Sequence, residues 1–286
     1  MELPGAVASA LPAAVAAETT EPSLQTQAQP GAASSSPMSQ HLYILTGASR
    51  GLGLAMAREL LQPGNQLLCL SRKTQDELQQ QAEAAEVVLE QWSQDLSLAG
   101  EAAIRLESWL TALPRQPLES VTLINNAGMI PHIGPLDALP VNDLAQAIRV
   151  GIEAPMQLTA AFLRGTADWP IARKVLNISS GLGRKPLAAQ AAYCAVKAGM
   201  DHFTRCVALE QVLLPHGARI CALAPGVVDT DMQVQMRSAD EFPDRERFAQ
   251  LKAEGKLTSP EDAARRILAY LARPDFGDQP IADVRD

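Results

Sequence analysis

TGASRGLG, at residues 46–53, is the stretch of sequence that decides the fold. The short apolar run HLYILT leads into it, and AMARELLQ, in which apolar residues recur at helical spacing, follows it. Glycines at positions 47, 51 and 53 allow a tight turn and a close approach of the backbone to a ligand. The first N–H groups of the following helix would favour a pyrophosphate there. This turn therefore predicts a dinucleotide site, and the alternative is a turn required only for packing.

The rest of the chain repeats the alternation of strand and helix. Strand separated from strand by helix indicates a parallel sheet with helices on both faces. We therefore expect an α/β fold with a doubly wound parallel sheet in a single domain, residues 38–286. Residues 231–257 are polar and irregular, and we expect them to form a substrate lid. Strands are expected at 41–46, 65–71, 86–92, 120–126, 172–179, 218–224 and 280–284, and helices at 55–62, 75–86, 97–112, 141–164, 191–213 and 259–273.

Residues 1–37 differ from the rest of the chain in composition. They are rich in Ala, Pro, Ser and Gln and contain no Lys or Arg. Such a segment buries too little apolar surface to order itself, so we expect a disordered, low-complexity tail. It does not resemble a signal peptide, because Glu2 replaces the usual basic residues and Pro4 and Pro12 interrupt the apolar stretch. Met38 opens the globular pattern, so the tail could also reflect the choice of start site.

Composition and charge exclude several classes of protein. A formal net charge of −8 argues against nucleic acid or an anionic membrane as the main partner. No apolar run approaches the roughly 20 residues that a membrane span needs. The four cysteines have no CxxC spacing, which suits reduced thiols in a cytoplasmic protein, and the four histidines have no metal-ligand spacing. We expect no metal site.

The end of the second strand bears on the choice of dinucleotide. An NAD site places a carboxylate there to bind the ribose 2′-hydroxyl, but this strand ends in LCLSRKT, with Ser71, Arg72 and Lys73. Arg50 adds a positive charge within the glycine turn. Because guanidinium groups match a phosphate in geometry, these residues favour NADP(H). The alternative is that Arg72 and Lys73 are solvated loop charges.

The stretch AAYCAVKAG, at residues 191–199, places Tyr193 and Lys197 one helical turn apart. A phenol has a pKa of about 10, and a nearby ammonium would lower it and make the tyrosine a better acid. Taken alone, the pair could equally be two surface residues of a helix.

Together these motifs resemble the short-chain dehydrogenase/reductase family, a Rossmann-type fold, over nearly all of residues 41–286. TGASRGLG resembles the family's TGxxxGxG turn, INNAG its NNAG motif, and PGVVDT, at 225–230, its PGxxxT segment. Asp95 and Leu96 match the adenine-contacting position after the third strand. The resemblance implies that the cofactor is bound by Gly47, Ser49, Arg50, Gly51, Leu52, Gly53, Ser71, Arg72, Asp95, Leu96, Asn126, Ala127, Gly128, Tyr193, Lys197, Pro225, Gly226, Val228 and Thr230.

The resemblance also implies catalytic roles. Tyr193 and Lys197 match the family's YxxxK, and Ser180, thirteen residues before the tyrosine, matches its serine; the neighbouring Ser179 is the alternative. Tyr193 would donate a proton to a carbonyl oxygen, Ser180 would hydrogen-bond that oxygen, and Lys197 would hold the nicotinamide ribose. One departure is Gly151, which stands where the family often has an asparagine that supports a proton relay.

PGVVDTDMQ, LKAEGKL and IADVRD are similar to the sepiapterin reductase branch, which includes benzil-type diketone reductases. In that branch a late aspartate can anchor the amino group of a pterin, and Asp283 matches its position; Met232 is a second candidate substrate contact. The family usually forms homodimers or homotetramers through the helices expected at 141–164 and 191–213.

These observations predict an NADPH-dependent reductase of vicinal diketones or pterin-like dicarbonyls. Two alternatives stay open: an NADP-dependent alcohol dehydrogenase of unknown substrate, and a non-catalytic NADP(H)-binding sensor. The intact set of Ser180, Tyr193 and Lys197 disfavours the sensor.

Overall fold

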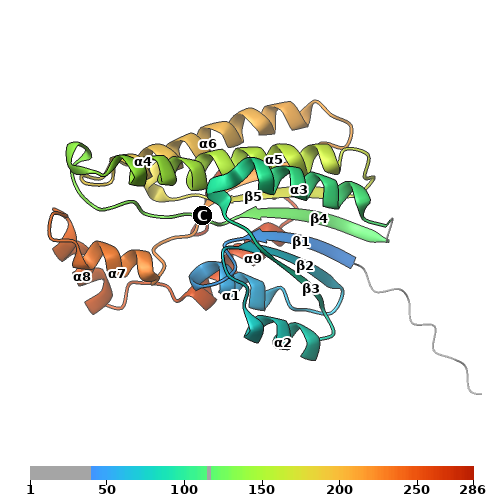
Figure 1. Ribbon diagram of the computed structural model, residues 1–286, viewed down its shortest axis with the longest axis horizontal. Helices are drawn as coiled ribbons and strands as arrows, with labels where there is room; N and C mark the ends of the chain where they lie inside the picture. The colour runs from blue at the N-terminus through green and yellow to red at the C-terminus, as the bar shows by residue number, and fades with distance from the viewer. Residues whose placement is uncertain (1–39, 115–116) are drawn as a thin grey trace, which may run out of the picture. The chain divides into compact units, whose positions relative to one another are not determined.

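The computed structural model describes residues 40–114 and 117–286, and its centre is one parallel sheet of seven strands (Figure 1). The prediction for residues 1–37 lies outside the described residues. The spatial order of the strands is β3-β2-β1-β4-β5-β6-β7, so the direction of winding reverses between β1 and β4. Ligands of open α/β sheets bind at this switch point, beyond the carboxyl ends of the strands. The strands are β1 (Gln40–Thr46), β2 (Asn65–Ser71), β3 (Val88–Ser93), β4 (Leu118–Asn125), β5 (Ala172–Ile178), β6 (Arg219–Ala224) and β7 (Ile281–Asp283).

Helices cover both faces of the sheet, as the doubly wound prediction requires (Figure 1). On one face α1 and α9 pack together with α2, and on the other α3, α5 and α6 pack against the sheet. The helices are α1 (Gly51–Glu59), α2 (Asp76–Ala84), α3 (Ala99–Ala112), α4 (Val141–Ile148), α5 (Ala154–Gly165), α6 (Ala191–Val212), α7 (Asp231–Ser238), α8 (Arg245–Ala253) and α9 (Pro260–Ala272).

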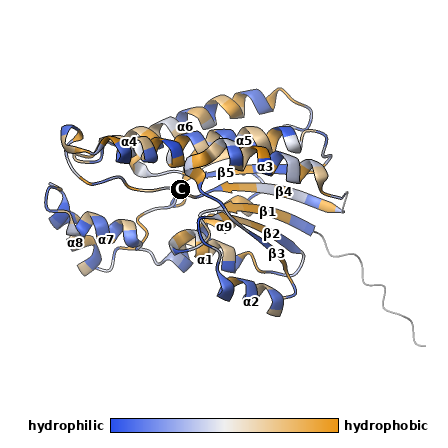
Figure 2. Cartoon of the chain, in the orientation of Figure 1, coloured by the Kyte–Doolittle hydropathy of each residue, from blue (hydrophilic) through white to orange (hydrophobic). Residues whose placement is uncertain are grey.

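The central strands are apolar on both sides because both sides are buried. Ile44 and Leu45 are neighbours in β1, are fully buried, and point into opposite hydrophobic clusters. Met56 of α1 packs in the cluster of Leu45, and Phe162 of α5 packs in the cluster of Ile44. Burying a side chain of this size stabilises the fold by about 1.5–3 kcal/mol. Figure 2 shows the resulting contrast between the hydrophobic strands and the more hydrophilic α7 and α8.

Two sequence predictions need correction. The single helix expected at 141–164 is two helices, α4 and α5, joined by a π-helical turn at Arg149–Glu153. The segment 231–257, expected to be irregular, contains α7 and α8. Its few apolar residues, Met236 and Phe242 among them, pack on Tyr193 rather than on the sheet. The polar composition of this segment therefore did not predict two helices, because their few apolar residues pack around Tyr193.

Candidate active site

The glycine turn between β1 and α1 is a cradle that side chains would fill. Gly47 has φ +73°, and a Cβ built on it would lie 2.9 Å from the Cα of Ala127. A Cβ on Gly53 would lie 2.0 Å from the carbonyl oxygen of Gly47. A Cβ atom does not come this close to another non-bonded atom, so both positions require glycine. The resulting close approach of bare backbone at the start of a helix fits the pyrophosphate of a dinucleotide.

Polar side chains from two neighbouring strands brace this turn. The Ser71 hydroxyl accepts a hydrogen bond from the Ala48 N–H at 2.8 Å. Asn126 donates through Nδ2 to the carbonyl oxygens of Thr46 at 3.1 Å and Gly47 at 3.3 Å. The Thr46 hydroxyl accepts from the N–H groups of Asn126 and Ala127, each at 3.0 Å. Ser71 and Asn126, predicted to bind the cofactor, thus hold the shape of the turn itself.

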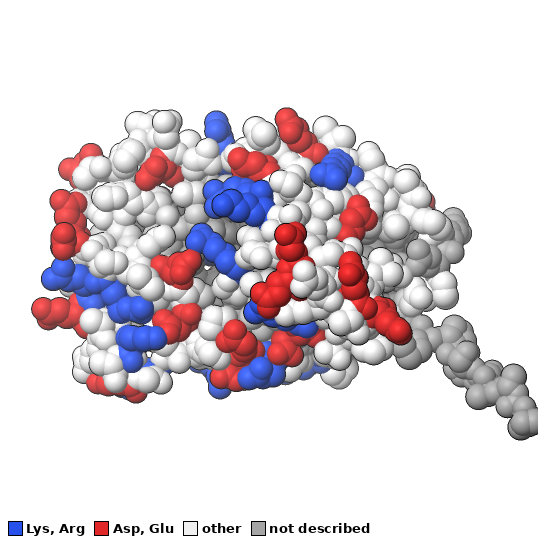
Figure 3. Space-filling view, turned by 60° about the horizontal axis from the view of Figure 1, so that its bottom comes forward, with Lys and Arg blue, Asp and Glu red and all other residues white. Residues whose placement is uncertain are grey.

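The basic residues near the turn differ in their partners. Arg72 and Lys73 are exposed, and neither forms an ion pair in the described part of the chain. Arg50 forms an ion pair with Asp231, at 2.8 Å between Nη1 and Oδ2, and both side chains are exposed. Asp231 was not among the residues that the sequence singled out. Figure 3 shows acidic and basic side chains interspersed over one face, with several Lys and Arg side chains near its middle.

Two further predicted cofactor positions have defined surroundings. The Asp95 carboxylate accepts a hydrogen bond from the Ser97 N–H at 2.9 Å, which lowers the pKa of Asp95 and keeps it ionised. Leu96 is buried beside it. The backbone carbonyl oxygen of Ser49 accepts from Gln75 Nε2 at 2.5 Å, which ties the glycine turn to the start of α2.

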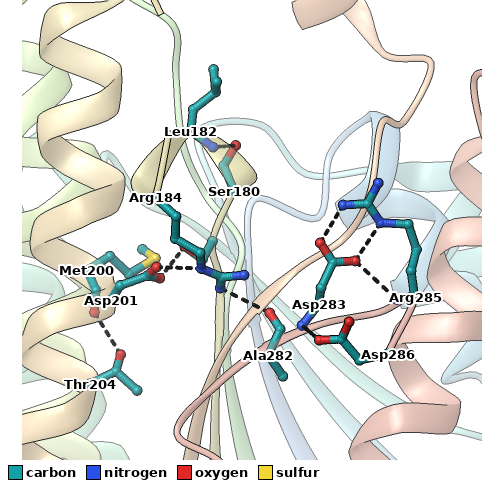
Figure 4. Close-up of polar contacts among 11 residues, drawn as sticks. Ser180, Leu182, Arg184, Met200, Asp201, Thr204, Ala282, Asp283, Arg285 and Asp286 are labelled. Carbon is teal, nitrogen blue, oxygen red and sulfur yellow. Dashed lines mark hydrogen bonds and ion pairs between the residues drawn. The ribbon is translucent and has the colours of Figure 1, made fainter. Parts of the chain in front are cut away.

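Ser180, Tyr193 and Lys197 line one cavity of about 550 Å³. Ser180 follows β5, and its hydroxyl accepts a hydrogen bond from the Leu182 N–H at 3.1 Å (Figure 4). Tyr193 and Lys197 lie on α6. Gly183 allows the Ser180 segment to approach this helix, because a Cβ at Gly183 would lie 2.9 Å from the Lys197 carbonyl carbon. The sequence did not single out Gly183, since its need arises only from this contact.

Burial controls the ionisation of the tyrosine and the lysine. Desolvation raises the pKa of Tyr193 to about 12, although its hydrogen bond with Ser180 opposes the shift. Desolvation also lowers the pKa of Lys197 to about 8, while the charge of Asp201 opposes it. Lys197 Nζ donates to the Ile178 carbonyl oxygen at 2.7 Å and lies 5.7 Å from the centre of the Tyr193 ring.

The net shift for Tyr193 is therefore opposite to the prediction that the lysine would lower its pKa. In the chain itself, removal of the phenol from water outweighs the hydrogen bond with Ser180 that lowers the pKa. The phenol keeps its proton at neutral pH, as a proton donor must.

The two neighbouring serines have different environments. The Ser179 hydroxyl is buried and donates a hydrogen bond to the Asp201 carboxylate. Ser180, in contrast, is hydrogen-bonded with Tyr193. The structure thus places Ser180, as the spacing predicted, beside the tyrosine.

A close contact with α6 explains why position 151 is a glycine. A Cβ at this position would lie 2.4 Å from Cγ1 of Val196, one residue before Lys197 on α6. No asparagine side chain fits there unless Val196 moves. The π-helical turn at Arg149–Glu153 accommodates this close contact between the two segments.

The segment after β6 connects the cavity to α7 and α8. Gly226 has φ +78°, which glycine adopts without strain. Thr230 is the N-cap residue directly before α7, and its carbonyl oxygen accepts from the Gln233 N–H at 2.8 Å. Asp229 forms ion pairs with Arg237 of α7 and Lys252 of α8. Further predicted residues that line the cavity are Leu52, Asn126, Gly128, Pro225, Gly226, Val228, Thr230, Met232 and Asp283.

The carboxylate of Asp283, which was predicted to anchor an amine, forms an ion pair with Arg285. Arg285 donates from Nε to Oδ1 at 2.7 Å and from Nη2 to Oδ2 at 2.5 Å, so that both carboxylate oxygens are engaged (Figure 4). Sequence reasoning missed Arg285, which lies in the turn directly after β7 and donates its backbone N–H to Asp283 Oδ1 at 3.1 Å.

Residues 40–114 and 117–286 contain neither a metal-binding cluster of side chains nor a membrane-spanning helix. No group of three or more His, Cys, Asp or Glu residues is arranged to hold a metal ion. No helix there combines the length and apolar character that a membrane span needs.

Comparison with known proteins defines the class of this protein. Residues 41–241 match the short chain dehydrogenase family. The chain belongs to this family, and it is an oxidoreductase that acts on C=O and CH–OH groups.

Individual relatives support the branch suggested by the sequence. The chain is 37% identical over 235 residues to benzil reductase ((S)-benzoin forming) of Bacillus cereus, which covers 82% of this chain and 94% of the relative. It is 32% identical over 259 residues to sepiapterin reductase of Rattus norvegicus, covering 85% of this chain and 95% of the relative. The predicted branch is thus confirmed.

A solved structure agrees with the fold. A metagenomic short-chain oxidoreductase in complex with NADP superposes with a TM-score of 0.65 at 26% identity, covering 87% of this chain and 96% of that one. The Rossmann-type, doubly wound sheet predicted from the sequence is confirmed.

Proposed function

We propose that this protein uses NADPH to reduce one carbonyl of a vicinal diketone or pterin-like dicarbonyl to an alcohol. The observation that carries the proposal is the convergence of Ser180, Tyr193 and Lys197 on one cavity beside the glycine turn. The similarity to benzil and sepiapterin reductases supports this class of substrate.

The residues around the glycine turn fit a dinucleotide. Gly47 and Gly53 leave room for a pyrophosphate, and the ionised Asp95 is suited to accept a hydrogen bond from the adenine. Arg72 is exposed and forms no ion pair with the residues that the structure describes, which favours a 2′-phosphate and hence NADP(H) over NAD(H). When bound, NADPH supplies the hydride that reduces the carbonyl carbon.

The chain's own residues supply the proton and the charge stabilisation. The Ser180 hydroxyl hydrogen-bonds the carbonyl oxygen and stabilises the negative charge that develops on it. Tyr193 donates its phenolic proton to the same oxygen, so one hydride and one proton convert C=O to CH–OH. The Lys197 ammonium, held by the Ile178 carbonyl, then stabilises the phenolate until a proton returns from solvent.

The test is the loss of NADPH absorbance with benzil, diacetyl, sepiapterin and a simple ketone. Tyr193→Phe should lower kcat by about 10²–10⁴-fold while NADPH still binds. Tyr43→Phe, a half-buried tyrosine of β1 outside the site, is the matched control and should keep full activity. A Tyr193→Phe variant as fast as the parent would refute the mechanism. Tight NADPH binding with no turnover of any carbonyl would instead favour the non-catalytic sensor.

Cofactor preference has its own test. Arg72→Ala should weaken NADPH binding far more than NADH binding, because only NADPH carries the 2′-phosphate. Arg266→Ala, an exposed arginine of α9, is the control for loss of one positive charge. Equal losses for the two cofactors would assign Arg72 a packing role.

We also infer that the protein forms a homodimer or homotetramer through α4, α5 and α6. Large apolar side chains are exposed there, among them Val141 at 80% and Val212 at 76%. Light scattering after size exclusion measures the oligomer. The cytoplasmic location and the absence of nucleic-acid or membrane partners stay predictions.

A further inference from the structure

The cavity wall beyond the catalytic residues is basic, although the whole chain is acidic. Besides Lys197, the described residues that line the cavity include four cationic side chains and one carboxylate. The formal charge of this wall is therefore +3, against −8 for the chain. A concave site with low-dielectric walls concentrates the field of such charges on whatever enters it. The five side chains are Arg184, Lys185, Arg247, Arg285 and Asp283.

The single carboxylate is neutralised by the chain itself. Arg285 binds both oxygens of Asp283 in the two-pronged arrangement described above, and its own N–H donates to Oδ1 at 3.1 Å. The Asp283 side chain is 13% exposed, whereas that of Arg285 is 62% exposed. A ligand that enters here therefore meets the guanidinium more readily than the carboxylate. A ligand amine would have to displace Arg285 to reach Asp283.

Arg184 is fixed on the opposite side of the same region. Its Nε donates to Asp201 at 3.1 Å and its Nη2 to the Ala282 carbonyl oxygen at 3.0 Å (Figure 4). Asp201 is buried on α6 and also accepts from Ser179. The Arg184 side chain keeps 30% exposure while its position is set by these bonds. It follows Ser180 by four residues, so a fixed cation lies close to the serine.

Lys185 and Arg247 contribute the charges that are least compensated. Lys185 is exposed, and no ion pair of its ammonium occurs within the described residues. Arg247 of the lid helix α8 is 71% exposed and lies 3.9 Å from Asp244, at the limit of an ion pair. These two cations come from the Ser180 segment and from the lid, so they approach the cavity from different elements.

We propose that this cavity selects dicarbonyl substrates that carry a carboxylate, which Lys185 and Arg247 bind, whereas Arg184 and Arg285 are held in ion pairs with Asp201 and Asp283. This inference rests on the proposed function and narrows its substrate class. It disfavours an amine-bearing pterin, because the carboxylate expected to anchor the amine is held by Arg285. Arginine and lysine are the usual partners of carboxylates, and each charge-assisted hydrogen bond adds to affinity.

The test compares two substrates that differ only in charge: benzil bearing a 4-carboxylate and the methyl ester of that acid. With NADPH at saturation, kcat/KM should be about tenfold or more higher for the carboxylate, the effect of one charge-assisted hydrogen bond. The double variant Lys185→Gln, Arg247→Gln should bring the ratio close to one and leave the rate for the ester nearly unchanged. Both side chains are exposed, so the variant should fold.

The control removes the same amount of charge elsewhere. Arg149→Gln with Arg266→Gln changes two exposed arginines outside the cavity and should preserve the ratio. Equal rates for acid and ester in the parent, or a ratio that survives loss of Lys185 and Arg247, would overturn the proposal. A loss in the control as large as in the cavity variant would also overturn it, since the preference would then come from net charge.

The anion site can also be tested if the protein reduces neither compound. If neither compound is reduced, calorimetry with NADP⁺ present measures binding of the acid and the ester without turnover. A preference for the acid that Lys185→Gln, Arg247→Gln removes would keep the anion site while the reductase proposal fails. No preference in binding would overturn the anion site as well.

Discussion

Replacing Gly151 by alanine should destabilise the protein, because the new methyl group overlaps Val196. The added Cβ would lie 2.4 Å from Cγ1 of Val196, whereas carbon atoms in favourable contact lie about 3.5–4.0 Å apart. One of the two segments must therefore shift by about 1 Å. Overpacking costs about 1–3 kcal/mol, and the better helix propensity of alanine returns roughly 0.5–1 kcal/mol. The expected net loss in the free energy of unfolding is about 1–2 kcal/mol.

The assay is equilibrium unfolding in urea at one protein concentration, so that any oligomer contributes equally. Gly100→Ala is the matched control. Gly100 lies in α3, and the nearest atom to its added Cβ would be Gln157 Oε1 at 3.6 Å, an ordinary contact. This control should be neutral or more stable by up to about 1 kcal/mol.

A second substitution, Val196→Ala, tests whether the overlap with Val196 causes the loss. Val196→Ala removes the methyl groups that Gly151→Ala would strike, so in that background Gly151→Ala should be neutral or stabilising. The coupling between the two changes should equal the overpacking cost, about 1–3 kcal/mol. If Gly151→Ala alone matched Gly100→Ala, or if its cost persisted beside Val196→Ala, the steric explanation of Gly151 would be wrong.

Three other predictions concern Lys197, the glycine turn and helix α8. Burial lowers the pKa of Lys197 from 10.5 to about 8, so below pH 8 its ammonium costs about 3 kcal/mol of stability. The unfolded chain holds that proton more tightly, so the parent's free energy of unfolding should rise between pH 8 and 10 relative to that of Lys197→Met. Urea unfolding at a series of pH values measures both proteins, and the same pH dependence in both would contradict the prediction. Gly53→Ala should weaken NADPH binding by more than about tenfold, because its Cβ would lie 2.0 Å from the Gly47 oxygen; fluorescence titration measures this, with Gly100→Ala as control. Asp229→Asn removes the ion pairs with Arg237 and Lys252 and should speed hydrogen exchange in α8 by up to about fivefold, with β4 unchanged. Equal exchange in the parent and the variant would show that Asp229 does not hold α8 in place.

Local patterns determined most of the fold. Apolar runs between helical repeats predicted the parallel sheet, because strands buried on both faces have to be apolar throughout. The glycine turn was equally readable, since positive φ at Gly47 and the contact at Gly53 depend on neighbours a few residues away. Helical spacing alone brings Tyr193 and Lys197 onto one side of α6.

Other features depend on residues far apart in the chain. The helices α7 and α8 were read as irregular because their apolar residues pack on Tyr193, a contact that no local period encodes. The need for glycine at 183 arises from Lys197, and the need at 151 from Val196.

The sequence by itself therefore determined the family and the sheet, which follow from short motifs and local patterns, and it proposed Ser180, Tyr193 and Lys197 as the reacting groups. Only the tertiary structure decided the chemistry of those groups. Burial set the direction of the pKa shift of Tyr193 against the sequence-based prediction, because desolvation depends on every atom that covers the phenol. It likewise decided that Arg247 of α8 shares a cavity wall with Arg184, Lys185 and Arg285, since the charge of a cavity is the sum over segments that meet only after folding.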